Sequence, residues 1–435
     1  MLPGAMSRPK VIIVGGGFGG LACAVKLDRR PVDVLLLDGR NFHLFTPLLY
    51  QVATALLNPS DIAYPLRRRF RRSPNVRFLQ AHVESIDFAG RVVRTRGGAD
   101  LPYDYLVMAT GSTNNYFGNQ ELAAATIGMK TLEEALRLRN HVLSCLERAS
   151  QEHDEAERRR WLTFVIVGGG PTGVEYAGAL VELLRMVLGR DYPDLAPSLA
   201  RIVLAEGQDR LLEAFPDRLG RYAERTLRRR GVEVRTGALV EKATDQSALF
   251  SDGEEIATRT IVWSAGVRPD SPSTAPDPPR SRTRRIEVDE RLRIPECEGA
   301  FAIGDVAAGT RGGIELPMLS AVAMQAGRYV AGLIMDEVGS SSAGRQVAPK
   351  PFRYRDKGIM ATIGRNAAVG QIAGVGLTGF IGWVGWLVVH LYYLVGFRNR
   401  MVVFASWAWD YLKRDRPIRI ITRADDDPIV EGWTR

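Results

Sequence analysis

The sequence predicts an α/β protein that contains two units of similar design and an apolar C-terminal region, on the basis of three observations. Residues 11–14 form an apolar run that leads directly into a glycine-rich turn, and residues 164–167 lead into a turn of the same form. Residues 379–397, near the end of the chain, contain no Asp, Glu, Lys or Arg. Because short apolar runs of this kind are typical of buried parallel strands, the two glycine turns predict two Rossmann-like dinucleotide-binding domains.

The length and composition are those of a folded protein with two or three domains. Of the 435 residues, 46% are hydrophobic and 25% are charged, as in most globular chains. The formal net charge is +9, but acidic residues are scattered among the basic ones and no basic face with interleaved aromatic residues is visible. We therefore expect no nucleic-acid binding, and an anionic membrane surface suits a basic chain better.

The cysteines and histidines argue against a disulfide framework and against a metal site. Cys23, Cys145 and Cys297 lie far apart and form no CxxC pair, which suits a reducing compartment. None of the histidines has a second ligand at metal-binding spacing, so no metal is expected. No apolar run precedes the first predicted strand, so no secretory signal is expected either.

The first glycine turn reads Gly15-x-Gly17-x-x-Gly20, between a predicted strand and a predicted helix. A second apolar strand then ends in Asp38, eighteen residues after Gly20. In this context the pattern is a dinucleotide fingerprint. Gly15 allows the tight turn, Gly17 lets the backbone reach a pyrophosphate, and Gly20 lets the helix pack on the strand. Asp38 is expected to bind a ribose hydroxyl.

The second glycine turn, Gly168-x-Gly170-x-x-Gly173, repeats this context, and the following strand ends in Glu206. A carboxylate there accepts a hydrogen bond from a free 2′-hydroxyl and repels a 2′-phosphate. The second ligand should therefore be NAD(H) more than NADP(H), although Arg210 nearby weakens this preference. A chain with two such units most simply binds two dinucleotides.

A third motif, Gly304-Asp305, ends an apolar strand and resembles the Gly-Asp motif of the two-dinucleotide-binding flavoproteins. The stretches LVMATGS (106–112) and IVWSAGVRP (261–269) resemble the strands that close the FAD and NAD modules of those proteins. Residues 270–285, rich in Pro, Ser and Arg, are expected to form an exposed loop. The resemblance implies a split FAD-binding domain (1–115 and 290–350), an NADH-binding domain inserted into it (116–285), and a C-terminal quinone-site and membrane-association region (351–435).

The region expected beside the flavin has no thiol. Residues 42–67 follow the second predicted strand, where disulfide reductases of this architecture carry a cysteine pair, and they contain no cysteine. Disulfide reduction, sulfide oxidation and peroxidase chemistry all need a nearby thiol. The electrons must therefore leave the flavin for an acceptor that needs no protein thiol.

Four stretches carry a more specific resemblance. They are NFHLFTPLLYQVA from Asn41, LPMLSAVAMQAGRYVA from Leu316, YRDKGIMATIGRNAAV from Tyr354 and LVGFRNRMVVFASWAWDYL from Leu394. Together, and in order, they resemble the type II NADH dehydrogenases, the single-subunit NADH:quinone oxidoreductases. This resemblance implies FAD as the cofactor, NADH as the substrate and a membrane quinone as the acceptor. No proton pumping is expected, since no ionisable residues are spaced along transmembrane helices.

The same resemblance implies catalytic roles for Glu175, near the nicotinamide, and for Gln325 and Lys357, beside the flavin and the quinone entrance. Simpler interpretations remain open for all three residues. Glu175 would also suit a helix start, Lys357 a solvated turn, and Gln325 a helix surface. The family pattern Ala-Gln-x-Ala-x-Gln carries Ala321 at its first glutamine here, which affects the pose of the quinone.

The expected ligand-binding residues follow from these motifs and from the resemblance. For FAD they are Gly15, Gly17, Phe18, Gly20, Asp38, Thr46, Pro47, Ala109, Thr110, Gly111, Gly304 and Asp305. For NADH they are Gly168, Gly170, Gly173, Glu175, Glu206, Ala265 and Gly266. For the quinone they are Ala321, Gln325 and Met360.

The C-terminal apolar segment is expected to lie on a membrane. Residues 381–397 number seventeen, fewer than the ~20 of a spanning helix, and glycines at its start disfavour a helix while favouring close packing. A helix over 401–414 would carry Met401, Phe404, Ala405, Ala408, Tyr411 and Leu412 on one face and Ser406, Asp410, Lys413 and Arg414 on the other. Positive charge would surround it from Arg398, Arg400, Lys413, Arg414, Arg416 and Arg419. This composition predicts a monotopic protein at the cytoplasmic face of an inner membrane.

Several alternatives stay open at this stage. The C-terminal segment could instead form a buried hairpin, a dimer interface or a single span, and a homodimer through this segment is also expected. The electrons could pass to a soluble protein such as a ferredoxin or a rubredoxin, with no need for an amphipathic tail. A flavoprotein that senses NADH without catalysis is the third possibility.

Overall fold

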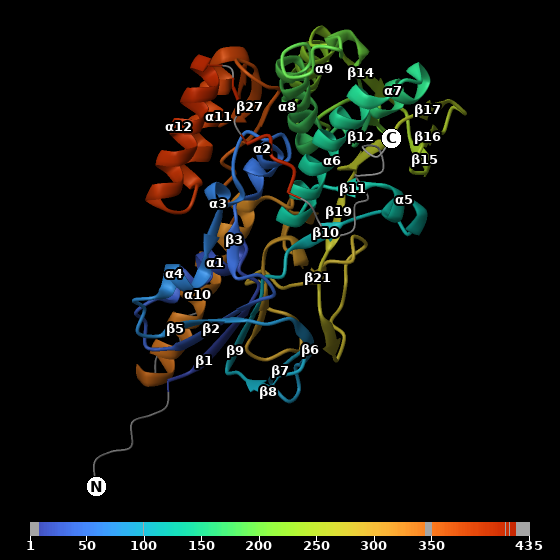
Figure 1. The fold of residues 1–435 in the computed structure, drawn as a ribbon. Helices are drawn as coiled ribbons and strands as arrows, with labels where there is room; N and C mark the ends of the chain where they lie inside the picture. The colour runs from blue at the N-terminus through green and yellow to red at the C-terminus, as the bar shows by residue number, and fades with distance from the viewer. Residues whose placement is uncertain (1–7, 99, 344–349, 414, 417, 423–435) are drawn as a thin grey trace. The chain divides into compact units, whose positions relative to one another are not determined.

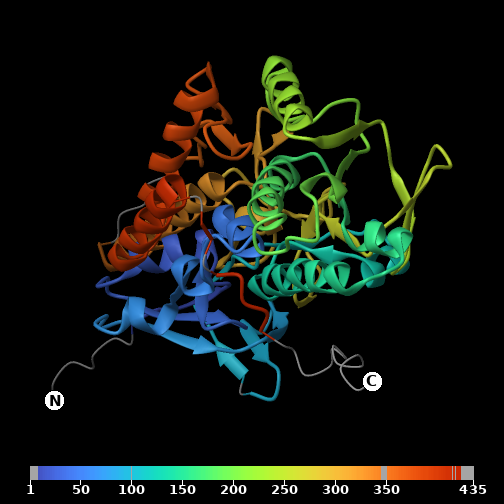
Figure 2. The ribbon, with the colours of Figure 1, turned by 45° about the horizontal axis from the view of Figure 1, so that its top comes forward.

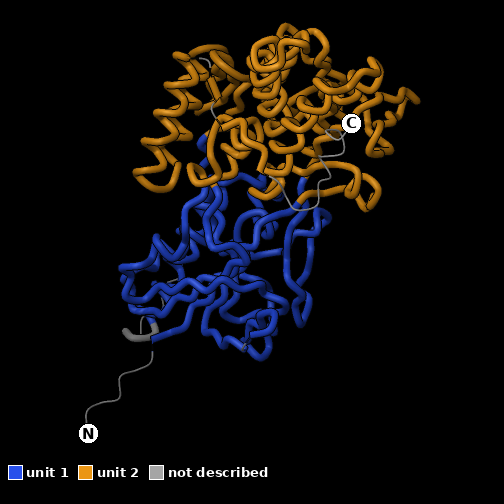
Figure 3. The backbone as a smooth tube through the Cα atoms, in the orientation of Figure 1, with its two compact units in different colours: residues 1–44, 63–113, 267–357 blue, residues 45–62, 114–266, 358–435 orange. Residues whose placement is uncertain are grey.

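The computed structural model describes residues 8–98, 100–343, 350–413, 415–416 and 418–422 (Figures 1 and 2). The chain folds into two compact units, and each is assembled from three separate segments (Figure 3). Unit 1 comprises Met1–Leu44, Ala63–Thr113 and Val267–Lys357, and unit 2 comprises Phe45–Ile62, Asn114–Gly266 and Gly358–Arg435.

Unit 1 is built on a five-stranded parallel sheet in the order β22-β9-β1-β2-β5. The central strand β1 (Lys10–Val14) is buried from its second residue onward, as in a sheet that is covered on both faces. Helix α1 (Phe18–Leu27) follows it and packs on α10 (Ser320–Ala343). The other strands of the sheet are β2 (Asp33–Asp38), β5 (Val76–Gln80), β9 (Tyr105–Met108) and β22 (Ala300–Ala302).

A second sheet of unit 1, in the order β20-β6-β7-β8, corrects one prediction. Residues 270–285, expected to form a loop, contain β20 (Ser273–Ala275), which pairs with β6. The prolines fall just outside this strand, and an edge strand needs hydrogen bonds on one side only. The remaining elements of unit 1 are β3 (Phe42–Leu44), β4 (Ala63–Pro65), α4 (Leu66–Phe70), β6 (Val83–Asp87), β7 (Val92–Thr95), β8 (Asp100–Pro102), β21 (Ile286–Glu287), η3 (Gly304–Val306), β23 (Ala307–Ala308), β24 (Thr310–Arg311) and β25 (Ile314–Glu315).

Unit 2 repeats the parallel design with the strand order β11-β18-β12-β13-β14. Strand β12 (Thr163–Val167) is fully buried and leads into α8 (Pro171–Val187), so the α/β prediction is confirmed in both units. Helix α6 (Leu132–Gln151) begins with a reciprocal cap between Thr131 and Glu134. The other elements between residues 114 and 266 are α5 (Gln120–Ala125), β11 (Ile127–Gly128), α7 (Glu155–Trp161), η2 (Pro197–Leu199), β13 (Arg201–Glu206), α9 (Asp217–Arg229), β14 (Val232–Thr236), β15 (Val240–Ala243), β16 (Ser247–Phe250), β17 (Glu255–Ala257) and β18 (Thr260–Trp263). The chain passes between the units after residues 44, 62, 113, 266 and 357; the third of these points lies in β10 (Ser112–Asn114) and the fourth directly precedes β19 (Val267–Pro269).

The C-terminal region is part of unit 2 and packs on α8. A Cβ on Gly178 of α8 would come within 2.6 Å of the Ile363 carbonyl oxygen, so helix and strand backbone are in close contact. The C-terminal elements are β26 (Ile359–Thr362), β27 (Ala368–Ile372), β28 (Val375–Thr378), α11 (Gly379–Tyr393) and α12 (Phe397–Lys413).

The compact units therefore differ from the expected ranges in three places. The region expected separately over 351–435 is divided, with residues 358–435 in unit 2. Residues 45–62, expected in the FAD-binding domain, belong to unit 2, and residues 267–285, expected in the NADH-binding domain, belong to unit 1. The 45–62 segment forms η1 (Thr46–Leu48), α2 (Leu49–Ala53) and α3 (Pro59–Ile62); α2 packs on α6 and α8, and α3 packs on α12. These contacts join segments that lie far apart in the sequence, so no local sequence pattern predicts them.

The expectation that glycines would weaken the start of the apolar segment is wrong, because α11 begins at Gly379 and runs through Gly382 and Gly385. The expected close packing is present: a Cβ on Gly382 would lie 3.0 Å from the Ala368 carbonyl oxygen. Helices α11 and α12 contact each other (Figures 1 and 2). In the part of the chain that the structure describes, neither these helices nor any other is long and apolar enough to cross a bilayer.

Candidate active site

The first glycine turn has the geometry that its sequence predicts. Gly15 has φ of 107°, and a Cβ there would lie 2.2 Å from the Ala109 carbonyl oxygen. A Cβ on Gly20 would lie 1.9 Å from the Gly15 carbonyl oxygen, so only glycine lets α1 approach the turn. Around Gly17, by contrast, a Cβ would meet no atom within 4 Å. The backbone at Gly17 therefore lines open space, as a pyrophosphate site requires.

The second glycine turn in unit 2 has the same geometry. Gly168 also has φ of 107°, and a Cβ on Gly173 would lie 1.9 Å from the Gly168 carbonyl oxygen. A Cβ on Gly170 would meet nothing within 4 Å. Each unit thus has one open backbone cradle at the start of a helix, and each fits a dinucleotide phosphate.

An acidic residue stands beside each turn. Asp38 accepts hydrogen bonds from the Gly16 amide (2.6 Å, to Oδ2) and the Arg40 amide (2.8 Å, to Oδ1). Glu206 repeats this arrangement with the Gly169 amide (2.6 Å, to Oε2) and the Gln208 amide (2.8 Å, to Oε1). Because every carboxylate oxygen can accept a second bond, both groups can also receive a ribose hydroxyl.

The other expected FAD residues of unit 1 gather at the carboxyl ends of neighbouring strands. Strands β1, β9 and β22 are adjacent in the sheet, so their ends bring together residues 15–20, 109–111 and 304–305. Gly111 has φ of 78° and no atom near the position of a Cβ, and Asp305 accepts a bond from the Ser112 hydroxyl (2.6 Å). The open backbone and the adjacent carboxylate fit the phosphates and hydroxyls of FAD.

Arg285 supports the backbone at Gly304, a role that no sequence motif predicts. It is buried, and its guanidinium donates to the carbonyl oxygens of Leu316 (2.7 Å) and Gly304 (3.4 Å) and to the Glu315 carboxylate (3.2 Å). Phe18 opens α1 and makes an edge contact with the buried His43 ring at 5.0 Å.

The remaining expected cofactor residues lie in unit 2. Thr46 and Pro47, predicted with the FAD group, belong to η1 of unit 2 and not to unit 1. Ala265 and Gly266, predicted with the NADH group, follow β18 beside the second glycine turn, where a Cβ on Gly168 would lie 2.7 Å from the Ala265 backbone.

Glu175 is buried rather than placed at an exposed helix start. It is the fifth residue of α8 and is 8% exposed. Its Oε1 accepts the backbone N–H of Thr362 (3.2 Å) and the indole N–H of Trp386 (3.2 Å). Burial raises the pKa of Glu175 to about 8, and these two bonds oppose the rise only in part. The carboxyl group is therefore largely protonated at neutral pH.

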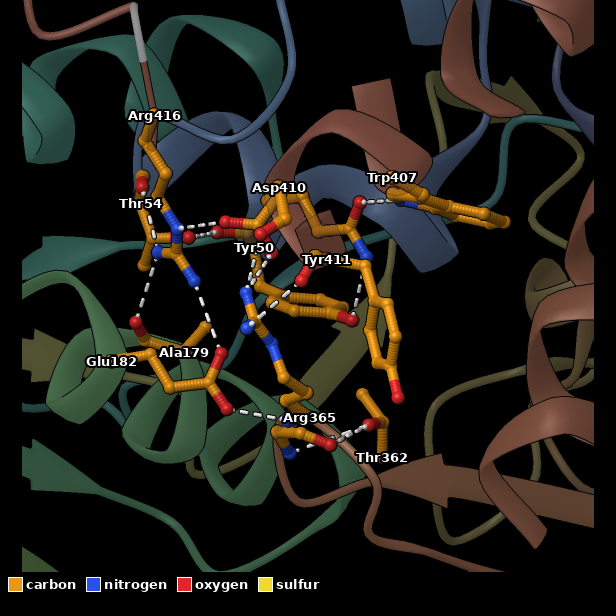
Figure 4. Close-up of polar contacts among 12 residues, drawn as sticks. Tyr50, Thr54, Ala179, Glu182, Thr362, Arg365, Trp407, Asp410, Tyr411 and Arg416 are labelled. Atoms are coloured by element: carbon orange, nitrogen blue, oxygen red, sulfur yellow. Dashed lines mark hydrogen bonds and ion pairs between the residues drawn. The ribbon is translucent and has the colours of Figure 1, made fainter. Parts of the chain in front are cut away.

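A cluster of charged groups in unit 2, of which Arg416 is buried and the others are partly buried, lies beside Tyr50 and Thr362 (Figure 4). We call Glu182, Arg365, Asp410 and Arg416 the ion cluster. Arg416 binds Glu182 (3.1 Å) and the carbonyl oxygens of Thr54 and Ala179 (3.1 Å each), and Arg365 binds Asp410 (2.9 Å). A cavity of about 50 Å³ is lined by this cluster together with Tyr50, Thr362 and Trp386.

This cluster corrects the prediction that Arg416 surrounds the C-terminal helix with surface charge. The side chain is 2% exposed and turns inward onto α8 and α12. Asp410, expected on the solvent-facing side of the helix, likewise faces inward toward Arg365 and Arg416. Arg414 lies outside the described residues.

The apolar face of the C-terminal helices is the exposed one. On α11 the exposed side chains recur about every four residues, and α12 continues the pattern with Leu412 at 76% exposure. The exposed members, which we call the apolar stripe, are Phe380, Ile381, Val384, Val388 and Tyr392 on α11 and Phe397, Met401, Phe404, Trp409, Tyr411 and Leu412 on α12. Both helices thus expose apolar side chains, while Trp386 of α11 and Asp410 of α12 make their polar contacts within unit 2.

The expected quinone residues are divided between the two units: Ala321 and Gln325 belong to unit 1, and Met360 belongs to unit 2. Gln325 uses both ends of its amide on the Arg355 backbone, donating to its carbonyl oxygen (2.9 Å) and accepting from its N–H (3.0 Å). This anchors the segment that leads to the exposed Lys357. Ala321 packs beside Leu316 and Val322 in unit 1. Met360 belongs to unit 2, where its methyl group lies beside Gly385 of α11.

The three cysteines are buried and form no disulfide. Burial raises the pKa of Cys23 to about 12, so this thiol is unsuited to thiolate chemistry. Within the described ranges no cluster of three or more His, Cys, Asp or Glu residues could hold a metal ion.

Comparison with known proteins gives matches over nearly the whole chain. The family described as pyridine nucleotide-disulphide oxidoreductase matches residues 9–327. The type II NADH:quinone oxidoreductase Ndh of Mycobacterium tuberculosis is 37% identical, over 95% of this chain and 90% of that protein. A mitochondrial internal alternative NAD(P)H-ubiquinone oxidoreductase A1 of Arabidopsis thaliana is 31% identical, over 92% of this chain and 83% of that protein.

Two solved structures share the fold. NDH2 from Plasmodium falciparum, in complex with NADH, superposes with a TM-score of 0.87 at 19% identity, over 96% of this chain and all of that one. The sulfide:quinone oxidoreductase of Aquifex aeolicus superposes with a TM-score of 0.71 at 18% identity, over 94% of this chain and 96% of that one.

Proposed function

Since the chain belongs to the pyridine nucleotide-disulphide oxidoreductase family and, within it, to the type II NADH:quinone oxidoreductases, we propose that it oxidises NADH through FAD and reduces a quinone at a membrane surface. The electron pair passes without proton pumping. When bound, FAD supplies a group that takes a hydride from NADH and gives two electrons to the quinone. The chain itself binds and orients FAD, NADH and the quinone, and its side chains supply the proton chemistry.

Unit 1 carries the FAD site and unit 2 carries the NADH site in this proposal. Support comes from the two open cradles at Gly17 and Gly170 and from the acid beside each turn. In unit 1, Asp305 and the backbone at Gly111 stand at the same sheet edge as the first turn. In unit 2, Glu206 favours the free 2′-hydroxyl of NADH.

Glu175 carries the proton chemistry. The overall reaction is NADH + H⁺ + quinone → NAD⁺ + quinol, so one proton beyond the hydride must come from solvent. A carboxyl group whose pKa is raised to about 8 can hold that proton at neutral pH and release it when negative charge develops nearby. Because Oε1 already accepts two N–H groups, the acid proton belongs on Oε2.

Gln325, Lys357 and Ala321 of unit 1 are proposed to border the quinone, and Met360 of unit 2 is proposed separately as a quinone contact. The amide of Gln325 supports this by fixing the backbone just before Lys357, whose ammonium would stabilise anionic charge on a reduced ring. Ala321 stands where related enzymes carry a glutamine, so this side of the quinone has an apolar contact in place of a hydrogen bond.

The apolar stripe is proposed to lie in the headgroup layer of a membrane, with α11 and α12 parallel to its surface. Exposed Phe, Trp and Tyr side chains of this kind favour the interface. The cytoplasmic face of an inner membrane is proposed because three cysteines that form no disulfide suit a reducing compartment. Alternatively, the apolar stripe forms a homodimer interface through the same helices. Light scattering with and without detergent distinguishes membrane binding from dimerisation.

Anaerobic stopped-flow absorbance on the detergent-purified yellow protein tests the function. We expect NADH to bleach the flavin rapidly and a short-chain quinone to restore its colour rapidly. Bleaching without reoxidation by any quinone would point to a soluble protein acceptor. A flavin that NADH reduces only slowly would point to an NADH sensor.

A further inference from the structure

Trp386 is the one large side chain that α11 buries. Of the fifteen residues of the helix only Gly382 and Trp386 are buried, and the others are partly buried or exposed. The indole is 1% exposed, whereas Val388, two residues later, is 62% exposed. An amphipathic helix of this length would be held by several apolar contacts on its inner face. Here Trp386 is the one fully buried large side chain of that inner face.

The indole is fixed on several sides within unit 2. Its ring stacks on His390 with centroids 4.0 Å apart and an angle of 22°, and it also contacts Trp407 (5.8 Å) and Tyr50 (6.3 Å). His390 in turn places Nδ1 2.7 Å from the carbonyl oxygen of Trp386. This packing leaves the indole N–H directed at Glu175 Oε1, 3.2 Å away.

We propose that Trp386 is a positioning residue for Glu175: its indole N–H holds the Glu175 carboxyl in place. Through this bond the proton affinity of the carboxyl depends on how α11 packs within unit 2. The inference deepens the proposed function and rests on the proton role of Glu175. Helix α11, which carries part of the apolar stripe, thus contacts the Glu175 carboxyl directly through a hydrogen bond.

The physical basis is the small number of donors that reach this carboxyl. Burial favours the neutral acid, and the Thr362 amide and the Trp386 indole favour the carboxylate. With one of two donors removed, the buried carboxylate loses stabilisation and the acid holds its proton to higher pH. Loss of the donor also frees the carboxyl to rotate, since only the Thr362 bond then restrains it.

The other ionisable groups near Glu175 do not replace this donor. Tyr50 on α2 is kept neutral, as burial raises its pKa well above the usual value. Burial lowers the pKa of His390 on α11 to about 4, so this ring is neutral as well. The charged groups on the surrounding elements belong to the ion cluster and bind one another: Glu182 on α8, Arg365 after β26, Asp410 on α12 and Arg416 after α12.

Trp383 offers a matched control on the same helix. It lies three residues earlier and lines the same cavity, but its ring stacks on Tyr411 with centroids 5.6 Å apart. Trp383→Phe therefore removes an indole of equal size from α11 without changing the donors to Glu175.

The test is the pH dependence of kcat for the holoenzyme with NADH and a short-chain quinone, in wild type, Trp386→Phe and Trp383→Phe. We expect the alkaline limb to move upward by about 1 pH unit in Trp386→Phe and to stay in place in Trp383→Phe. The infrared band of the protonated carboxylic acid, followed against pH without turnover, should move by the same amount. Equal shifts in both variants, or none in Trp386→Phe, would overturn the inference.

Two further variants distinguish a failure of the role proposed for Trp386 from a failure of the role proposed for Glu175. If Trp386→Phe fails to fold, replacement of Trp386 by benzothienylalanine keeps the ring shape without the N–H and should give the same upward shift. Glu175→Gln should abolish the limb and the infrared band, alone and combined with Trp386→Phe. A limb that persists in Glu175→Gln refutes the proposed role of Glu175 itself. A limb that is lost there but unmoved in Trp386→Phe refutes only the role of the indole.

Discussion

At the scale of single residues, the glycines of the two turns matter because a Cβ atom at these positions would either clash with the backbone or occupy the space of a ligand. Gly20 and Gly173 let a helix approach a turn within contact distance, while Gly17 and Gly170 leave room for a ligand. These roles are local, since the atoms concerned lie within a few residues of each other. The sequence could therefore predict them, together with the acids Asp38 and Glu206 at the ends of the following strands.

Gly20→Ala should abolish FAD binding, because the new Cβ would overlap the Gly15 carbonyl oxygen at 1.9 Å. We expect a loss of more than about 4 kcal/mol of unfolding free energy, measured by thermal denaturation together with flavin absorbance per chain. Gly332→Ala in α10 is the control, since a Cβ there meets nothing within 4 Å. That variant should be stabilised by about 0.5–1 kcal/mol and should retain its flavin.

Glu206→Gln should weaken the preference for NADH over NADPH by about tenfold. The amide removes the repulsion of a 2′-phosphate and one charged acceptor for the ribose hydroxyl. The ratio of kcat/KM for the two cofactors measures this change. Asp38→Gln in unit 1 should leave that ratio unaltered, and an equal effect of both variants would argue against the assignment of unit 2 to NADH.

The pKa of Glu175 predicts the alkaline limb of activity. Its carboxyl is protonated below about pH 8 and ionised above, so kcat should fall as the pH rises through that value. In Glu175→Gln the side chain cannot release a proton, and kcat at pH 7 should drop about 100-fold with no limb near pH 8. Steady-state rates between pH 6 and 10 provide the measurement, and a retained limb would contradict the assignment.

At the scale of elements, the sequence predicts strands that follow a local pattern and misses contacts that join distant segments. Strands β1, β2, β12 and β13 were all expected from their apolar runs. The bond between Glu175 and Trp386 spans 211 residues, and that between Arg416 and Glu182 spans 234. Helix α11 forms despite its glycines because Gly382 packs on β27, so tertiary contact overrides helix propensity.

The apolar stripe predicts how α11 and α12 respond to charge. Val388→Glu and Leu412→Glu place a carboxylate on exposed apolar positions and should reduce binding to anionic vesicles at least about tenfold. Reduction of a soluble dye by NADH should be unchanged, because neither residue contacts the cofactor cradles. Leu239→Glu is the control, as Leu239 is also exposed but lies outside the C-terminal helices. Vesicle flotation would settle the point, and undiminished binding by both helix variants contradicts the proposed surface.

At the scale of the whole molecule, the ion cluster ties three distant segments of unit 2 into one core. Arg416→Met should leave Glu182 and Asp410 without one buried partner and lower the unfolding free energy of unit 2 by about 3 kcal/mol. Lys413→Met, on the exposed side of α12, should change it by less than about 0.5 kcal/mol. Urea denaturation followed by tryptophan fluorescence compares them, and equal losses would show that the burial of Arg416 has little energetic weight.

The burial of Arg416 also sets an order of events during synthesis. Unit 2 needs residues 45–62, then 114–266, and finally the guanidinium of Arg416 in its third segment. Domains tend to fold as units while the ribosome is still adding residues. Here the carboxylates of Glu182 and Asp410 lack this buried partner in a nascent chain until residue 416 has been added and can fold back onto them. Ribosome stalling or a premature stop just before codon 416 would therefore release a protein with two complete glycine turns and an unfinished interior, which is a natural target for proteolysis.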